Sequence, residues 1–226
     1  MIEYNIDYSI PCMYEDYCMD TSSTCKKTCH RYLEITFLFS NCGMKTPEKY
    51  TKELIPDDVD KNVFEALNQL KLHAKDYIES GRNLFIQSIN PQTGKTSWAL
   101  KIMYTYFHYV WCYNGFKPRG YFVYVPDLIM NLKDFEYRKT SEYKQLVNIL
   151  KTVDVVIWDD LNLLHLTSTE SDLLYTLVHK RIQDNKTNIV TGVHQEESKL
   201  LETVGENLGK RLVKFNQIVL RGGSKC

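Results

Sequence analysis

The sequence predicts a three-layer α/β fold, with helices on both faces of a mostly parallel sheet, behind a small cysteine-rich N-terminal module. From residue 61 onward, short apolar segments of strand length alternate with segments of helical periodicity, a pattern typical of such sheets. Gly94-Lys95-Thr96 stands where a predicted strand passes into a predicted helix. Five of the seven cysteines lie within the first 42 residues. We therefore expect a module at 1–42, a linker at 43–60 and an α/β domain at 61–226.

The composition limits the possible functions. A chain of 226 residues with 43% hydrophobic and 25% charged residues suffices for one ordinary domain and a small appendage. The 28 basic residues balance the 28 acidic ones, so a strongly basic nucleic-acid-binding surface is not expected. The first ten residues lack the basic and apolar regions of a secretory signal, and no apolar stretch has the length of a membrane span. We expect a cytoplasmic protein without a membrane partner.

The domain opens with a predicted helix at 61–79, whose apolar residues recur at helical spacing and which Gly81 ends. A short apolar strand at 83–88 and a helix at about 95–111 follow. Aromatic residues crowd this second helix. We expect them to pack in the core rather than to stack on bases, because four apolar residues share one helical face: Ala99, Met103, Tyr106 and Val110.

The rest of the domain continues the alternation of strands and helices. Further short apolar runs predict strands at 121–125, 154–158, 187–191 and 217–220. Segments of helical periodicity predict helices that begin after Pro126 and cover about 142–151, 170–183 and 196–208. The strand at 121–125 separates the strand before Gly94 from the strand at 154–158 in the chain. This order suggests that those two strands are not neighbours in the sheet, as in ATPases in which water attacks ATP.

Residues 88–97 have the context of a phosphate-binding loop, since they follow a predicted strand and open a predicted helix. Gly94 lets the backbone approach a phosphate, Lys95 offers a positive charge to the β- and γ-phosphates, and Thr96 offers a hydroxyl to Mg²⁺. The predicted nucleotide-binding residues are Asn90, Pro91, Gln92, Thr93, Gly94, Lys95, Thr96, Ser97 and Asp159.

The loop departs from the usual pattern at two positions. Ile89 stands where the pattern has glycine, and Gln92 stands where many such loops have a further glycine. A non-glycine residue at positive φ costs on the order of 1–3 kcal/mol. The alternative is a chance Gly-Lys-Thr at the start of a helix.

The apolar strand at 154–158 runs into two carboxylates, which is the Walker B arrangement. Asp159 is the predicted Mg²⁺ ligand, with Thr96, and Asp160 is predicted to orient or deprotonate the attacking water. A strand running into an acidic turn is the alternative. The ordered combination of a strand, Gly-Lys-Thr and a helix with this second strand favours an ATP·Mg²⁺ site.

The N-terminal cysteines suggest metal binding, because a chain without an export signal seldom relies on disulfides. Four thiolates can close a tetrahedral Zn²⁺ site and order a module too small to bury much surface. The predicted ligands are Cys12, Cys18, Cys25 and Cys29. Cys25 and Cys29 are spaced one helical turn apart at the start of a predicted helix at 31–40. We expect His30 to point elsewhere and Cys42 to be a free thiol; reduced, buried cysteines are the alternative.

Several blocks in this order resemble one family, the DnaC/DnaI-type replicative helicase loaders, in particular the compact phage and prophage versions. The blocks are Lys95-Thr-Ser-Trp-Ala99, Pro118-Arg-Gly-Tyr-Phe-Val-Tyr-Val-Pro126, Thr152-Val-Asp-Val-Val-Ile-Trp-Asp-Asp160, Asn188-Ile-Val-Thr-Gly192 and Leu208-Gly-Lys-Arg-Leu212. The resemblance covers nearly the whole chain. It implies an AAA+ P-loop NTPase fold without a C-terminal lid, ATP and Mg²⁺ as cofactors, and an N-terminal zinc module that grips the helicase.

The resemblance also implies partners: a replicative ring helicase, single-stranded DNA contacted weakly or within the complex, and further copies of the chain on the helicase ring. The family often has Asn near the γ-phosphate where this chain has Val193. It also has an arginine segment reaching a neighbouring subunit's ATP, where this chain reads Val213-Lys214-Phe215. Arg211 or Lys214 could supply that cation, although lysine lacks the bidentate fork of arginine. A slow ATPase or a nucleotide-gated clamp is therefore our hypothesis.

Three alternatives remain open at this point. An IstB-type transposition ATPase shares the core but assembles on duplex DNA. A small-molecule kinase needs an acceptor pocket and a lid. A nucleotide-silent adaptor or inhibitor of the helicase is favoured by Ile89, Gln92, Val193 and the missing arginine segment.

Overall fold

The computed structural model describes residues 6–12, 18, 25–44, 54–113, 115–134 and 137–222. Its centre is a five-stranded sheet in the order β2-β3-β4-β1-β5, in which every pair of neighbours is parallel. The strands are β1 (Leu84–Ser88), β2 (Gly120–Tyr124), β3 (Val155–Asp159), β4 (Thr187–Val193) and β5 (Asn216–Leu220). The predicted three-layer fold is confirmed, and so is the expectation that the strands leading to Gly94 and to Asp159 are separated: β4 lies between them.

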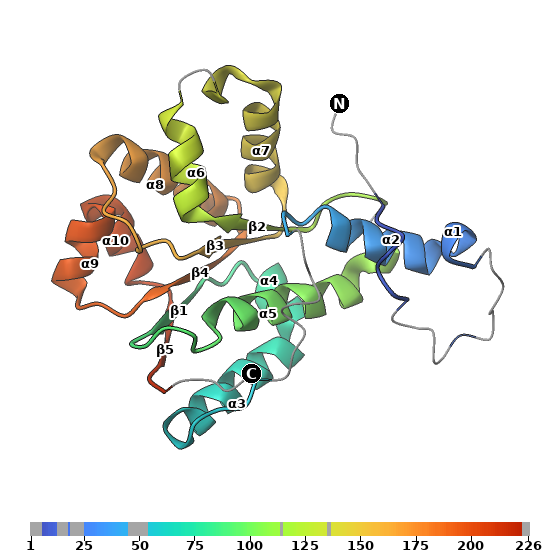
Figure 1. The fold of residues 1–226 in the computed structure, drawn as a ribbon, viewed down its shortest axis with the longest axis horizontal. Coiled ribbons are helices and arrows are strands. Elements are labelled where there is room, and N and C mark those ends of the chain that lie inside the picture. Colours follow the sequence, from blue (N-terminus) through green and yellow to red (C-terminus); the bar gives the residue numbers. More distant parts are fainter. Residues whose placement is uncertain are drawn as a thin grey trace.

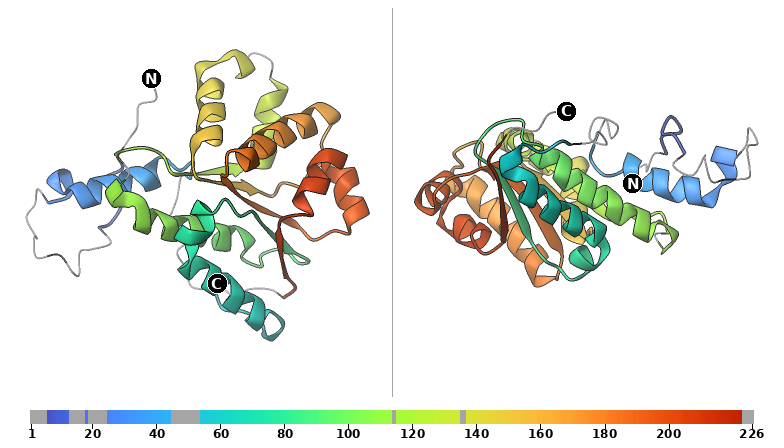
Figure 2. Two further views of the ribbon diagram at one scale, coloured as in Figure 1. Left: turned by 180° about the vertical axis from the view of Figure 1, so that it is seen from behind. Right: turned by 90° about the horizontal axis from the view of Figure 1, so that it is seen from below.

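Helices cover both faces of this sheet (Figures 1 and 2). One face is covered by α3 (Lys61–Leu72), α4 (Ala74–Glu79) and α5 (Lys95–Val110), and α2 (His30–Ser40) packs on α5 within the same core cluster. The other face packs against α6 (Val125–Lys133), α7 (Ser141–Thr152), α8 (Ser168–Gln183), α9 (Glu197–Val204) and α10 (Glu206–Leu212). Because both faces are covered, all five residues of β1 and of β3 are buried, which explains why each strand begins with a run of apolar residues and does not alternate with polar ones.

Two predicted helices are each divided in the structure. The helix expected at 61–79 ends at Leu72, and α4 begins after His73. The helix expected at 196–208 is interrupted at Gly205, whose φ of 86° belongs to the left-handed region that glycine tolerates. A Cβ at this position would collide with Ser171 Oγ, which donates a hydrogen bond to the Val204 carbonyl at 2.6 Å. The sequence pattern shows the apolar spacing but not this turn.

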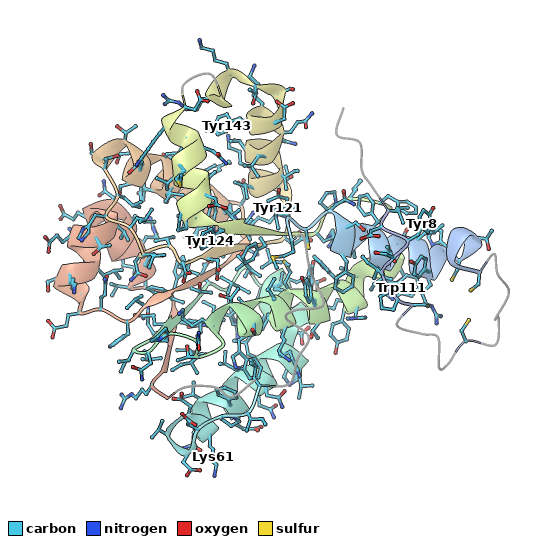
Figure 3. The ribbon with its side chains drawn as sticks, in the orientation of Figure 1. Tyr8, Lys61, Trp111, Tyr121, Tyr124 and Tyr143 are labelled. Carbon is cyan, nitrogen blue, oxygen red and sulfur yellow. The ribbon has the colours of Figure 1, made fainter. Side chains whose placement is uncertain are left out.

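The helix predicted at 31–40 is present as α2 and packs against α5. Phe39 contacts Tyr104 and Phe107 with ring centroids 4.8 and 5.6 Å apart, and all three belong to the core cluster on this face of the sheet. Just beyond α5 lies Trp111, which is labelled in Figure 3. Arg31 Cζ lies 5.4 Å from the centroid of the Trp111 ring. Residues 45–53 of the predicted linker lie outside the described residues, and the division at 1–42, 43–60 and 61–226 stays a prediction.

The structure also bears on two further expectations from the sequence. No helix within the described ranges has both the length and the apolar character needed to cross a membrane. The face of α5 predicted to pack in the core does so, because Ala99, Met103, Tyr106 and Val110 are all buried.

Arg181 of α8 is fully buried and joins three elements at the amino-terminal end of the sheet. Its guanidinium donates to the carbonyls of Leu150 and Val153 at the end of α7, at 2.6 and 3.0 Å. It also donates to the Thr187 carbonyl at 2.6 Å and to Asn188 Oδ1 at 2.9 Å, both on β4. Removing it would leave several buried acceptors without a donor, each costing about 1–3 kcal/mol.

We expect Arg181→Met to lower the free energy of unfolding by about 3–5 kcal/mol, the range for breaking a buried polar network. Urea unfolding followed by circular dichroism measures this change. Lys180→Met is the matched control on the same helix. Its side chain forms a surface ion pair with Asp184, so its loss should cost less than about 1 kcal/mol. Equal, small losses in both variants would contradict the role given to Arg181.

Candidate nucleotide-binding site

The loop between β1 and α5 has the backbone geometry of a phosphate-binding loop. Gly94 precedes the first residue of α5 with φ 86°, and its carbonyl accepts from Trp98 N–H at 2.9 Å, which closes the first helical turn. Gln92 has φ 57°, so the position where many such loops carry glycine takes the left-handed conformation here too. This strain costs about 1–3 kcal/mol.

Ile89 carries no such strain. It lies outside the left-handed region, and its N–H donates to the Leu220 carbonyl at 3.0 Å, which extends the pairing of β1 with β5. Of the two departures from the usual loop pattern, only the one at Gln92 has a conformational cost.

The loop lines an open pocket of about 750 Å³ at the carboxyl-terminal edge of the sheet. All eight predicted loop residues line it: Asn90, Pro91, Gln92, Thr93, Gly94, Lys95, Thr96 and Ser97. Lys95 Nζ donates to Ser88 Oγ across the loop at 2.9 Å. With the free N–H groups of the α5 N-terminus, this ammonium makes the pocket suited to an anion such as a polyphosphate.

Asp159, at the end of β3, meets the loop directly. Its Oδ1 accepts a hydrogen bond from Thr96 Oγ1 at 2.8 Å and another from Thr191 Oγ1 at 2.7 Å. Burial raises the pKa of Asp159 to about 6, and its hydrogen bonds with Thr191 and Thr96 act in the opposite direction. A hydroxyl and a carboxylate are the hard oxygen donors that Mg²⁺ prefers, so Thr96 and Asp159 fit this cation. The structure thus brings together the two predicted magnesium ligands.

Asp160 lines the same pocket and has an unusual backbone. Its φ is 52°, in a region that non-glycine residues seldom occupy. Its N–H donates to Thr191 Oγ1 at 3.0 Å, which supports this conformation. Such outliers cluster at functional sites, and the position agrees with the predicted role in orienting water.

Two residues of this site were missed from the sequence. Thr191 is a buried polar residue on β4, and such a residue in an apolar strand was the signal that could have found it. Asn162 clamps the end of β4: its Oδ1 accepts from Val193 N–H at 2.9 Å, and its Nδ2 donates to the Val193 carbonyl at 2.8 Å. No sequence pattern pointed to Asn162.

The C-terminal cations predicted to act in trans lie outside this pocket. Arg211 is on α10, and its Nη2 lies 3.0 Å from His179 Nδ1, while the His179 ring stacks on Tyr175 at 5.3 Å. Lys214 follows α10 and is exposed. Neither side chain lines its own chain's pocket, so their catalytic role stays a prediction that requires a second chain.

The structure does not support a zinc site. Cys12, Cys18, Cys25 and Cys29 are partly buried, and in the described part of the chain no three His, Cys, Asp or Glu side chains gather closely enough to hold a metal ion. The local geometry also differs from the prediction. Cys25 belongs to α1 (Cys25–Thr28), whereas Cys29 has extended backbone between α1 and α2, so the two do not share one helix.

The structure also describes Cys42 and His30, and their exclusion from a metal site stays a prediction. Cys42 is a free thiol, fully buried, and burial raises its pKa to about 11, which keeps it protonated. His30 Nε2 lies 3.4 Å from Glu34 Oε1, one turn further along α2.

The parallel sheet, the phosphate-binding loop after β1 and the carboxylates after β3, with β4 between, define a P-loop NTPase of the AAA+ class. The sequence profile of the family described as IstB-like ATP binding protein matches residues 53–205. The chain belongs to this family. A search of curated proteins found no match.

Solved structures share the fold. The crystal structure of the DnaC helicase loader aligns with a TM-score of 0.61 and 21% identity, over 76% of this chain and 99% of that chain. The crystal structure of DnaI gives 0.60 and 16%, over 79% and 96%. Domain III of the Thermotoga maritima replication initiation protein DnaA gives 0.57 and 18%, over 77% and 67%. The predicted resemblance to DnaC/DnaI-type proteins is confirmed in fold; the phage type stays a prediction.

Gly192 offers a test of the clamp at the end of β4, because a Cβ there would collide with Asn162 Oδ1. We expect Gly192→Ala to lower the free energy of unfolding by about 1–3 kcal/mol, as for overpacking. In an Asn162→Ala background the added cost should shrink, since the obstructing amide is gone. Urea unfolding of the four proteins gives the coupling. Equal costs in both backgrounds would show that the collision is not the cause.

Proposed function

We propose that the protein is an ATP-dependent loader, which binds a replicative ring helicase and helps place it on single-stranded DNA during DNA replication. The observation that carries its ATP-dependent part is the hydrogen bond between Thr96 and Asp159, which unites the phosphate-binding loop with the acidic strand. The helicase part is supported by the fold shared with the DnaC helicase loader and DnaI.

Each residue of the site has a role in this function. Lys95 and the N–H groups at the start of α5 bind the β- and γ-phosphates. Thr96 and Asp159 hold Mg²⁺, which neutralises phosphate charge when bound. Asp160 orients the attacking water or accepts its proton. Arg211 or Lys214 reaches the ATP of a neighbouring copy on the helicase ring.

We expect hydrolysis to be slow. Around the pocket, Ile89, Leu163 and Val193 present exposed apolar side chains, and Val193 stands where the loader family often has a polar group near the γ-phosphate. Because this rim is apolar and hydrolysis is expected to be slow, we favour a nucleotide-gated clamp. In such a clamp, the contacts with helicase and DNA depend on the bound γ-phosphate. The rival reading is a nucleotide-silent adaptor or inhibitor. Val193 and Gln92 favour it, whereas the unstrained Ile89 does not.

An IstB-type transposition ATPase is the second candidate, because the matching family profile covers residues 53–205. The two functions share the ATP site and differ in partner: the transposition ATPase would assemble on duplex DNA. The cysteine-rich segment precedes the matched range. We retain it as the proposed helicase-binding module; its zinc content stays part of this proposal.

A nucleotide titration separates ATP-binding functions from the adaptor. We expect the wild type to bind ATP, and Lys95→Ala to weaken binding about 10- to 100-fold, the equivalent of a lost charge-assisted hydrogen bond of about 1.5–3 kcal/mol. Fluorescent-nucleotide titration measures both affinities. Lys151→Ala, on exposed α7 surface, is the matched control and should bind as the wild type does. Failure of the wild type to bind ATP at millimolar concentration would refute the proposed ATP site.

A binding assay separates the loader from the transposition ATPase. We expect the full-length protein to retain the replicative ring helicase of its source organism in a pull-down, and Cys25→Ser/Cys29→Ser to lose it while keeping ATP binding. Zinc content measured on the same samples tests the proposed metal. Absence of helicase binding, together with ATP-dependent assembly on duplex DNA, would favour the transposition function instead.

A further inference from the structure

We propose that Thr191 is a positioning residue for the magnesium carboxylate: its hydroxyl fixes Asp159 and the Asp160 backbone relative to each other. The inference rests on the proposed ATP·Mg²⁺ site and goes beyond it, since Thr191 belongs neither to the phosphate-binding loop nor to the acidic strand. It lies on β4, the strand between β1 and β3.

The directions of the two hydrogen bonds of Thr191 follow from their partners. An ionised carboxylate only accepts, so the hydroxyl proton points to Asp159 Oδ1 at 2.7 Å. A backbone N–H only donates, so the hydroxyl oxygen accepts from Asp160 N at 3.0 Å. One hydroxyl thus contacts both of the consecutive acidic residues.

A second hydroxyl converges on the same carboxylate oxygen. Thr96 Oγ1 donates to Asp159 Oδ1 at 2.8 Å, from the first turn of α5. Among the described residues, Asp159 Oδ2 accepts no hydrogen bond, so this oxygen is the one left for a cation or its water. Thr191 therefore fixes the carboxylate from the sheet side while Thr96 fixes it from the loop side.

The position of Thr191 gives this contact rigidity. Thr191 is fully buried, and it pairs with Ile86 of the neighbouring strand β1 in the sheet. The Leu161 N–H donates to the Thr191 carbonyl at 3.0 Å, which ties the exit of β3 to the same residue. Groups that orient a metal ligand in this way typically change metal affinity or activity by about 10- to 100-fold when removed.

Thr187 provides a matched control within the same strand. It is also a fully buried threonine, but it lies at the opposite end of β4, and its hydroxyl donates to the Ile78 carbonyl at 3.0 Å. A threonine-to-valine change removes a buried hydroxyl from β4 at either position. Only the change at Thr191 removes a contact with Asp159.

The experiment compares ATP affinity in Mg²⁺ and in EDTA for the full chain carrying Thr191→Val, Thr191→Ser or Thr187→Val. We expect Thr191→Val to weaken ATP binding in Mg²⁺ about 10-fold or more while changing it less than about twofold in EDTA. Thr191→Ser keeps the hydroxyl and should retain most of the gain from Mg²⁺. Thr187→Val should lower the free energy of unfolding without changing the ratio of the two affinities.

Two results would overturn the inference. In the first, Mg²⁺ increases the ATP affinity of Thr191→Val as much as that of the wild type; in the second, Thr191→Val loses the same ATP affinity in Mg²⁺ and in EDTA. If Thr191→Val does not fold, Thr191→Ala and Thr191→Ser give the same comparison with and without the hydroxyl. A wild type that binds no ATP in either buffer would refute the proposed function itself. If the wild type binds ATP and Thr191→Val keeps the full increase in ATP affinity from Mg²⁺, only the role of Thr191 is refuted.

Discussion

The buried carboxylate of Asp159 is the contact on which the arrangement of the site depends. It ends β3, accepts from Thr96 at the start of α5 and accepts from Thr191 on β4. The strand order makes this meeting possible, because β4 stands between β1 and β3 and can reach the carboxylate from the side. Without this junction, the loop after β1 and the acids after β3 would be two separate motifs on one edge of a sheet.

The two ends of β3 show how burial serves different purposes. Just before its amino end, Asp154 is held by Tyr106, Arg119 and Lys186. Burial acts to raise the pKa of Asp154, but the Lys186 and Arg119 contacts outweigh it and keep this pKa below its ordinary value. At the carboxyl end, Asp159 accepts from two hydroxyls, forms no ion pair with any described residue, and has its pKa raised by burial to about 6. The negative charge of Asp154 is thus balanced by Arg119 and Lys186, whereas the carboxylate of Asp159 is suited to an added cation.

The sequence was sufficient for the fold because its signals are local. Apolar runs predicted the strands, and the Gly94-Lys95-Thr96 turn between strand and helix predicted the phosphate-binding loop. The missed features depend on pairs distant in the chain. Thr191 becomes relevant only when β4 inserts beside β3, and the break at Gly205 reflects contact with Ser171 of α8. Sequence also could not tell that Gln92, rather than Ile89, takes the left-handed conformation, since that depends on the pairing of Ile89 with Leu220.

Helix α5 connects the nucleotide site to the N-terminal segment. Its first residues are Lys95 and Thr96, and near its other end Tyr104 and Phe107 pack against Phe39 of α2. At about 1.5 Å per residue, this helix of 16 residues spans about 24 Å. One packed helix thus carries both the phosphate-binding residues at its start and the aromatic surface on which α2 rests. The position of α2 relative to the nucleotide site is therefore set by the core packing of α5 rather than by a linker.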